Sequence, residues 1–89
     1  MSTNRFCYVY VLRSRADGQR YVGLTRDLRE RFRQHQAGRV RSTRNRLPLD
    51  LIYYEACRDI RDAAKREQYL KTAWGKRYIE GRIRLYLTG

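Results

Sequence analysis

Two short runs rich in β-branched and aromatic residues flank an Asp-Gly pair near the start of this 89-residue chain. The first run is Cys7–Arg13 and the second is Arg20–Thr25, with Asp17 and Gly18 between them. An Asp-Gly pair between two such runs is a strong signal for a turn that joins antiparallel strands. The sequence therefore predicts a β-hairpin, against which the later segments have to pack.

The segment after the hairpin has the pattern of a helix followed by a loop. Asp27 is placed to cap the helix, with Glu30 three residues on as in a capping box. Gly38 fits the end of this helix, which is expected to run to about Ala37. Residues 39–47 are polar and basic without periodicity and predict a loop.

The remaining residues predict one more strand and two more helices. Residues 49–57 have the composition of a third strand, and Asp59 is the next candidate cap. A second helix is expected over Ile60–Trp74, interrupted by Gly75. Residues 76–87 have apolar side chains at roughly helical spacing and predict a terminal helix.

The order ββαβα plus a terminal helix predicts an α+β fold, with a small three-stranded antiparallel sheet flanked by helices. The chain is expected to form one domain over residues 1–89, because a second domain would have too little core to fold alone.

The charge points to a phosphate-rich partner. The chain has 21 Lys and Arg against 9 Asp and Glu, a net charge of +12, mostly from Arg, which binds phosphate with two parallel hydrogen bonds. The alternative is that the charge only maintains solubility. The basic residues are spread along the chain rather than over one helix face, and no apolar run approaches the ~20 residues of a membrane span, so no membrane association is expected.

The cysteines and the first residues bear on metal binding, disulfide bonds and cellular location. Cys7 and Cys57 stand far apart and outside any metal-like spacing, and the chain has one His, so neither a disulfide framework nor a zinc site is expected. No signal-peptide core precedes the first strand. We expect a cytoplasmic monomer without a small-molecule cofactor.

One face of the predicted hairpin carries polar groups. Alternation places Tyr10 on one face, and symmetric pairing around the turn sets it opposite Gly23 and diagonal to Tyr21. Gly23 then leaves open space beside two phenol groups. The alternative is that tyrosine is simply favoured in strands.

The first predicted helix adds Arg31 and His35, one turn apart beside the apolar pair Leu28 and Phe32. Arg31 could instead extend its guanidinium into water. His35 could be a half-buried residue with satisfied hydrogen bonds.

Glu67 is the least expected residue of the second helix. It falls on the stripe formed by Ala63, Leu70 and Trp74, which is otherwise apolar. A carboxylate is rarely buried unless it is paired or binds a metal. Glu67 could form an ion pair with an Arg, or it could bind a hard divalent cation such as Mg²⁺. Two phenols, an Arg, a His and a carboxylate form a set that could cut a phosphodiester bond.

The sequence resembles the GIY-YIG nuclease superfamily. The motifs are Tyr8-Val9-Tyr10 and, eleven positions after Tyr10, Tyr21-Val22-Gly23; Arg31 follows Gly23 by eight positions, and His35 lies four further on. The stretch Ala63–Lys71 is similar to the metal-binding helix of that superfamily. Ser42-Thr43 through Pro48 and Tyr53-Tyr54-Glu55 are similar to its small stand-alone bacterial branch, the UPF0213-like proteins.

The resemblance implies an endonuclease that uses one divalent ion, Mg²⁺ or Mn²⁺, and leaves a 5′-phosphate and a 3′-hydroxyl in DNA. Tyr10 and Tyr21 would be the paired phenols, one of which deprotonates or orients the attacking water. Arg31 would contact the scissile phosphate, and His35 would relay a proton or hold the phosphate. Glu67 would bind the metal, and Gly23 would permit close approach of the backbone.

The chain departs from the superfamily pattern at two points. Tyr8 stands where the first motif usually has Gly, a variation that the small bacterial branch shares. No Asn follows Asn45, whereas several members use an amide near the end of the domain. Ser42, Thr43 and Lys71 are the candidates for that position.

The 39–47 loop is the predicted contact to the nucleic-acid backbone, through Arg39, Arg41, Arg44 and Arg46. The function expected from the whole pattern is metal-dependent DNA cleavage, in DNA repair or recombination. The alternative is a non-catalytic nucleic-acid-binding module or a small subunit of a larger complex. A structural role on the ribosome is a third hypothesis, motivated by size and charge alone.

Overall fold

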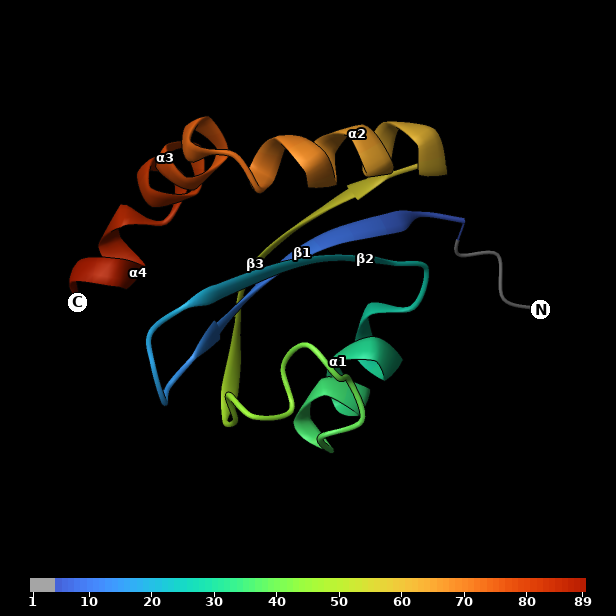
Figure 1. Ribbon diagram of the computed structural model, residues 1–89. Coiled ribbons are helices and arrows are strands. Elements are labelled where there is room, and N and C mark those ends of the chain that lie inside the picture. Colours follow the sequence, from blue (N-terminus) through green and yellow to red (C-terminus); the bar gives the residue numbers. More distant parts are fainter. Residues whose placement is uncertain (1–4) are drawn as a thin grey trace.

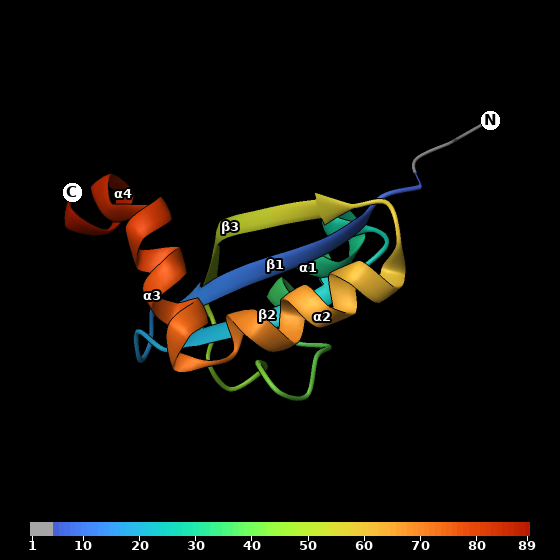
Figure 2. The same ribbon diagram turned by 90° about the horizontal axis from the view of Figure 1, so that it is seen from above.

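The computed structural model describes residues 5–89 and has the predicted α+β architecture. The elements are β1 (Cys7–Ser14), β2 (Arg20–Thr25), α1 (Leu28–Gln36), β3 (Leu49–Cys57), α2 (Ile60–Leu70), α3 (Ala73–Arg82) and α4 (Arg84–Thr88). The three strands form an antiparallel sheet with the order β2-β1-β3. Helix α1 lies on one face of the sheet, and α2 and α3 lie on the other, as Figures 1 and 2 show. No helix in this part of the chain has both the length and the apolar character needed to span a bilayer.

The hairpin has the register that its sequence predicts. Tyr10 pairs with Gly23, and Arg13 pairs with Arg20 at the last step before the turn. Gly18 has a φ of 71°, a left-handed conformation that glycine adopts without strain. The side chain of Asp17 accepts a hydrogen bond of 2.8 Å from the Gln19 amide, which fixes the turn locally.

The sheet separates two apolar cores. Buried side chains of β1, α2 and α3 form the larger core, which comprises Cys7, Val9, Val11, Ala63, Leu70 and Ile79. The smaller core lies under α1 and is built on Tyr10, Leu12 and Leu49. Strand β1 supplies residues to both cores, because successive side chains of a strand point to opposite faces.

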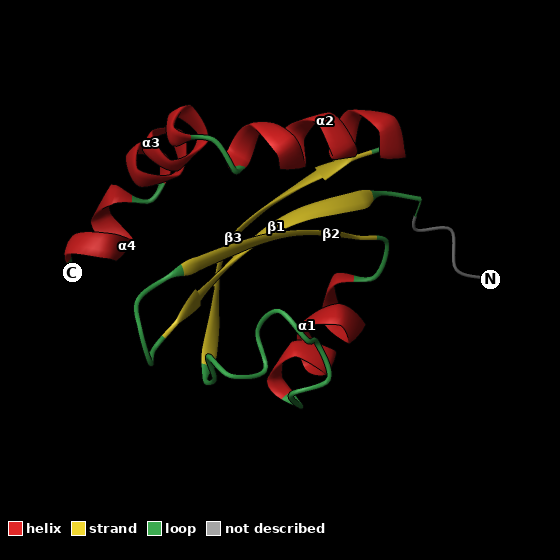
Figure 3. Ribbon diagram, in the orientation of Figure 1, coloured by secondary structure: helices red, strands yellow, loops and turns green. Residues whose placement is uncertain are grey.

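Helix α1 begins and ends as predicted, with one difference. The Asp27 side chain accepts a hydrogen bond of 3.1 Å from the Glu30 amide, and Gly38 follows the helix with a φ of 74°. The reciprocal half of the capping box is absent here, because the Asp27 amide donates to Thr25 Oγ1 and the Glu30 carboxylate pairs with Arg33. The loop over residues 39–47 follows, drawn in green in Figure 3, and it ends at a cis Leu47–Pro48 peptide bond.

The predicted boundaries of the last helices are wrong. Helix α2 ends at Leu70, and Thr72 caps α3 by accepting a hydrogen bond from the Gly75 amide. Gly75 lies inside α3, where a Cβ atom would collide with the carbonyl oxygen of Tyr69 and the backbone of Leu70. The glycine therefore permits close packing of α3 on the end of α2.

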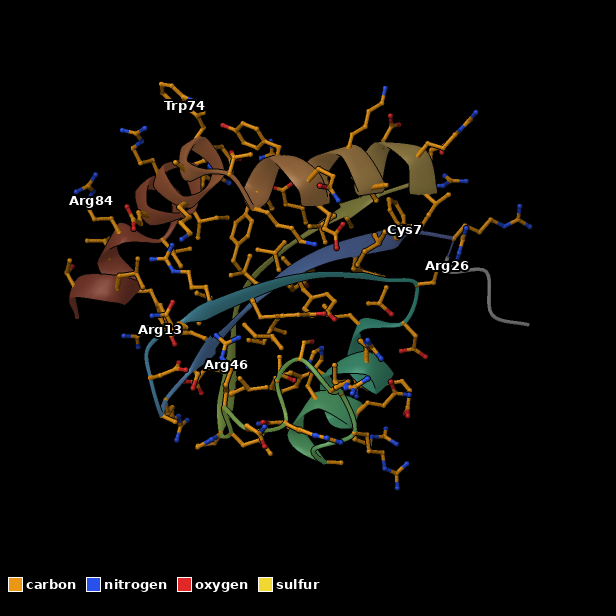
Figure 4. The ribbon with its side chains drawn as sticks, in the orientation of Figure 1. Cys7, Arg13, Arg26, Arg46, Trp74 and Arg84 are labelled. Atoms are coloured by element: carbon orange, nitrogen blue, oxygen red, sulfur yellow. The ribbon has the colours of Figure 1, made fainter. Side chains whose placement is uncertain are left out.

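Two further predictions about these helices are wrong, one for Trp74 and one for the terminal helix. Trp74 belongs to α3, is 68% exposed and points away from the sheet, so it does not continue the apolar stripe of α2 (Figure 4). The terminal helix is divided at Ile83, whose backbone leaves the helical conformation and whose side chain packs against the larger core.

Candidate active site

A chain of three buried polar side chains lies between β1, α1 and the 39–47 loop. The Tyr10 hydroxyl lies 2.9 Å from His35 Nε2, and His35 Nδ1 lies 2.7 Å from Thr43 Oγ1. All three residues have no exposed surface. Each imidazole nitrogen thus has one partner, as a buried histidine requires.

Burial and positive charge together set the protonation of this chain. The pKa of His35 falls to about 4, because burial disfavours the imidazolium and the Arg31 charge repels it. His35 is therefore neutral at pH 7. Burial raises the pKa of Tyr10, with the nearby Arg31 opposing the shift, so its phenol stays protonated.

The two hydrogen bonds are linked through the imidazole ring. A neutral imidazole has one donor and one acceptor nitrogen, so the roles of Nε2 toward Tyr10 and of Nδ1 toward Thr43 are opposite. Either tautomer satisfies both nitrogens, because both hydroxyl groups can donate or accept. The contacts form a continuous hydrogen-bonded chain from Tyr10 through His35 to Thr43.

Tyr21 and Arg31 lie beside this buried chain and complete a cluster of four predicted residues. The Tyr21 ring centroid is 5.1 Å from that of His35 and 6.3 Å from that of Tyr10. Both Tyr21 and Arg31 are half-buried, and the Arg31 guanidinium donates to Gln34 Oε1 at 3.0 Å. Tyr10, Tyr21, Arg31 and His35 are therefore brought together, and Tyr21 and Arg31 are the members that reach solvent.

The predicted open space at Gly23 is filled. A Cβ atom on Gly23 would collide with the Cζ and hydroxyl oxygen of Tyr10. The absence of a side chain therefore lets the Tyr10 ring lie across β2 toward His35. The structure corrects the expectation of empty space at this residue.

Glu67 lies on α2, over the other face of the sheet, and its side chain is 17% exposed. Its partner is Lys71, one turn on, with Nζ 3.3 Å from Oε2. The arginine nearest in the helix, Arg66, instead makes two hydrogen bonds of 2.7 and 2.8 Å to Glu55 on β3. Glu67 is thus paired with a lysine, rather than with the arginine that sequence reasoning considered.

A small hollow of about 260 Å³ lies beside strand β2, where β2 meets the ends of α2 and α3. Tyr21 lines it from β2, and Lys71 lines it from the end of α2. Arg20 and Lys76 also line it, and these two residues were absent from the sequence predictions. Their role in lining the hollow follows from the tertiary position of β2, at the sheet edge beside α2 and α3, and no sequence pattern indicated it.

The donor set at Glu67 restricts the metal chemistry. Within residues 5–89 no group of three or more His, Cys, Asp and Glu side chains could enclose a metal ion. A single carboxylate fits Mg²⁺ or Mn²⁺ when water and substrate phosphate supply the other oxygen ligands. Glu67 is compatible with such an ion and incompatible with a closed structural site.

The structure divides the predicted nucleic-acid-binding loop into exposed and anchoring residues. Arg39, Arg41, Ser42 and Arg44 are exposed. Thr43 faces inward to His35, and Arg46 lies near the hairpin turn, with Nε 3.4 Å from Asp17 Oδ2 (Figure 4).

Sequence reasoning missed a further anchor of the loop, Ser14. Its buried hydroxyl donates to the Arg46 carbonyl oxygen at 2.6 Å. Its position at the end of a strand gave no signal of this contact.

Comparison with known proteins defines the class. A family model of the GIY-YIG catalytic domain matches residues 6–87, so the chain belongs to the GIY-YIG family. Within that family it belongs with the UPF0213 proteins. It is 40% identical to one from Bacillus licheniformis over 88 residues, covering 94% of this chain and 89% of that protein. It is 40% identical to one from Bacillus pumilus over 77 residues, covering 82% and 78%.

A third UPF0213 protein, from Desulfotalea psychrophila, is 39% identical over 66 residues, which are 72% of this chain and 59% of that protein. No solved structure gives a significant match. The GIY-YIG domain is of nuclease type, and a nuclease domain implies binding to nucleic acid.

Proposed function

We propose that this protein is a divalent-metal-dependent endonuclease that hydrolyses phosphodiester bonds of DNA, in repair or recombination. The observation that carries the proposal is the cluster of Tyr10, Tyr21, Arg31 and His35 beside β2. Glu67 stands on α2, which packs against β2 from the other face of the sheet. The net charge of +12 favours a phosphate-rich substrate.

The exposed members of the cluster face the substrate. Arg31 binds the scissile phosphate and offsets the charge that develops on it. Tyr21 orients the attacking water, since it is the tyrosine that reaches solvent, whereas Tyr10 is fully buried. Tyr10 and His35 act behind Tyr21 as positioning residues: His35 holds the Tyr10 hydroxyl, and its pKa of about 4 makes the imidazole a weak proton acceptor at neutral pH.

Glu67 is the residue that would hold the divalent ion. When bound, the ion supplies positive charge to the phosphate and to the leaving oxygen. Glu67 leaves its ion pair with Lys71 in this state, and the released ammonium group of Lys71 is free to bind a neighbouring phosphate. In the absence of DNA and metal, Lys71 neutralises the carboxylate.

Cleavage of plasmid and branched DNA in Mg²⁺ or Mn²⁺ tests the proposal. Arg31→Ala and Glu67→Gln are expected to remove most of the activity. Arg33→Ala and Glu30→Gln are the matched controls on α1, because these two residues pair with each other away from the cluster. Equal activity in all five proteins refutes the assigned site and indicates a contaminating nuclease.

A non-catalytic nucleic-acid-binding module is the second candidate, and the Glu67–Lys71 ion pair is the observation that favours it. Salt dependence does not distinguish the candidates, because phosphate contacts weaken with salt in both. Binding that is unchanged in Glu67→Gln, together with no product at any metal concentration, supports the binding module.

A further inference from the structure

A second groove lies on the α1 face of the sheet, between the start of α1 and strand β3. Its volume is about 670 Å³, which is within the range of pockets that hold drug-sized ligands. Three aromatic residues line it, namely Tyr8 from β1, Phe32 from α1 and Tyr54 from β3. None of the three belongs to the cluster around His35.

Tyr54 presents the most open aromatic surface of this groove. The residue is 53% exposed, although it pairs with the fully buried Tyr10 across β1 and β3. The Tyr8 and Tyr54 rings meet edge to face, with centroids 6.0 Å apart and an interplanar angle of 63°. Because about half of Tyr54 is exposed, its ring offers surface on which a planar ligand could stack.

Positive charge borders the aromatic lining. Arg26 stands at the end of β2 (Figure 4), and Arg29 stands in the first turn of α1; both line the groove. Neither forms an ion pair within residues 5–89, and the acidic lining residue, Asp27, uses its carboxylate to cap α1. The groove thus offers an aromatic surface with a cationic border, which matches a nucleobase with its attached phosphate.

We propose that this groove binds one unpaired nucleotide of the DNA, with its base stacked on Tyr54 and its phosphate at Arg26 and Arg29. The inference rests on the proposed function in taking DNA as the ligand. Tyr54 lies on β3 and Tyr21 on β2, at opposite edges of the sheet, with β1 between them. The unpaired nucleotide is therefore bound at a distance from the scissile phosphate. The groove thereby selects DNA that contains an unpaired segment over a continuous duplex.

Binding without metal tests the groove separately from cleavage. Fluorescence anisotropy in EDTA compares a short oligothymidylate, the same length of abasic strand, and a blunt hairpin duplex. Tyr54→Ala is expected to weaken oligothymidylate binding by about five- to hundredfold, the usual effect of losing one stacked base. It should leave binding of the abasic strand and of the duplex unchanged. Tyr54→Phe, which keeps the ring, should restore binding.

Tyr86→Ala is the matched control, because Tyr86 is 59% exposed on α4 and lies outside the groove. A thermal melt of each variant verifies that it folds. If Tyr54→Ala and Tyr86→Ala bind equally well, or if Tyr54→Ala loses the same affinity for all three DNAs, the groove proposal is refuted and the nuclease proposal is unaffected. If Tyr54→Ala loses affinity only for oligothymidylate and the wild-type protein shows no metal-dependent cleavage, the groove proposal is supported and the nuclease proposal is refuted. A wild-type protein that binds none of the DNAs overturns both.

Discussion

Gly23→Ala tests whether the buried cluster depends on the missing side chain at residue 23. The new Cβ atom collides with the Cζ and hydroxyl oxygen of Tyr10, whose ring is fully enclosed. Overpacking a buried site costs about 1–3 kcal/mol. Displacing the ring also breaks the hydrogen bond between Tyr10 and His35, which leaves buried polar atoms unpaired at about 1–3 kcal/mol.

We expect Gly23→Ala to lower the free energy of unfolding by about 2–6 kcal/mol in total. Urea unfolding measures it. With a slope of about 1–2 kcal/mol per molar, the midpoint should fall by at least about 1 M. Gly81→Ala is the matched control, since nothing lies within 4 Å of a Cβ atom there. Gly81 is in α3, where alanine should be neutral or stabilising by up to about 1 kcal/mol.

A double-mutant cycle separates the collision from other effects of the new methyl group. In a Tyr10→Leu background the phenol is absent, so Gly23→Ala should cost less than about 1 kcal/mol. The same cost in both backgrounds would refute the assigned collision. A change within about 0.5 kcal/mol of wild type would refute the role of Gly23 altogether.

Thr43→Val should destabilise the fold by about 1–3 kcal/mol in urea unfolding, because His35 Nδ1 loses its partner; no loss would contradict the buried hydrogen bond. A proton NMR titration of His35, the single histidine, should give a pKa near 4, and a value near 6.5 would contradict the described burial. Because this folded-state pKa lies below the unfolded value of about 6.5, stability should fall as the pH drops from about 6.5 to 4, by about 1.4 kcal/mol per pH unit. Replacing Arg41 and Arg44 by Ala should weaken binding to all DNA sequences alike and reduce the salt slope by about one per residue, whereas an unchanged slope would remove the loop from the interface. Arg46→Ala should instead lower thermal stability, because Arg46 pairs with Asp17 at the turn.

Local patterns were sufficient for the strands and for the tyrosine face. The symmetric register around Asp17 and Gly18 placed Tyr10 opposite Gly23, and the i,i+4 spacing brought His35 to the same side as Arg31. The filling of the Gly23 space was not predictable, because the rotamer of Tyr10 depends on His35, a residue from another element. The inward orientation of Thr43 depends on how a loop without periodicity closes over α1.

In the region of α2 and α3, the sequence pattern predicted the buried face but not the helix boundaries. Ala63 and Leu70 are buried, as the apolar stripe predicted, but the stripe alone does not show where α2 ends. Gly75 looked like a helix breaker, and its actual role depends on the close approach of α3 to α2, a tertiary contact. Glu67 was correctly found to be unusual, while its partner Lys71 was chosen by geometry at the helix end.

Strand β1 contributes buried side chains to both cores, and the Tyr10 that it carries is also the first member of the buried hydrogen-bonded chain. Local opening of this strand therefore exposes Val9 and Val11 on one face whenever it releases Tyr10 on the other. The amide hydrogens of β1 should accordingly exchange with solvent only through global unfolding. The protein cannot release Tyr10 from His35 on its own, so in the proposed nuclease any adjustment to substrate has to come from Tyr21, Arg31 and the exposed arginines of the loop.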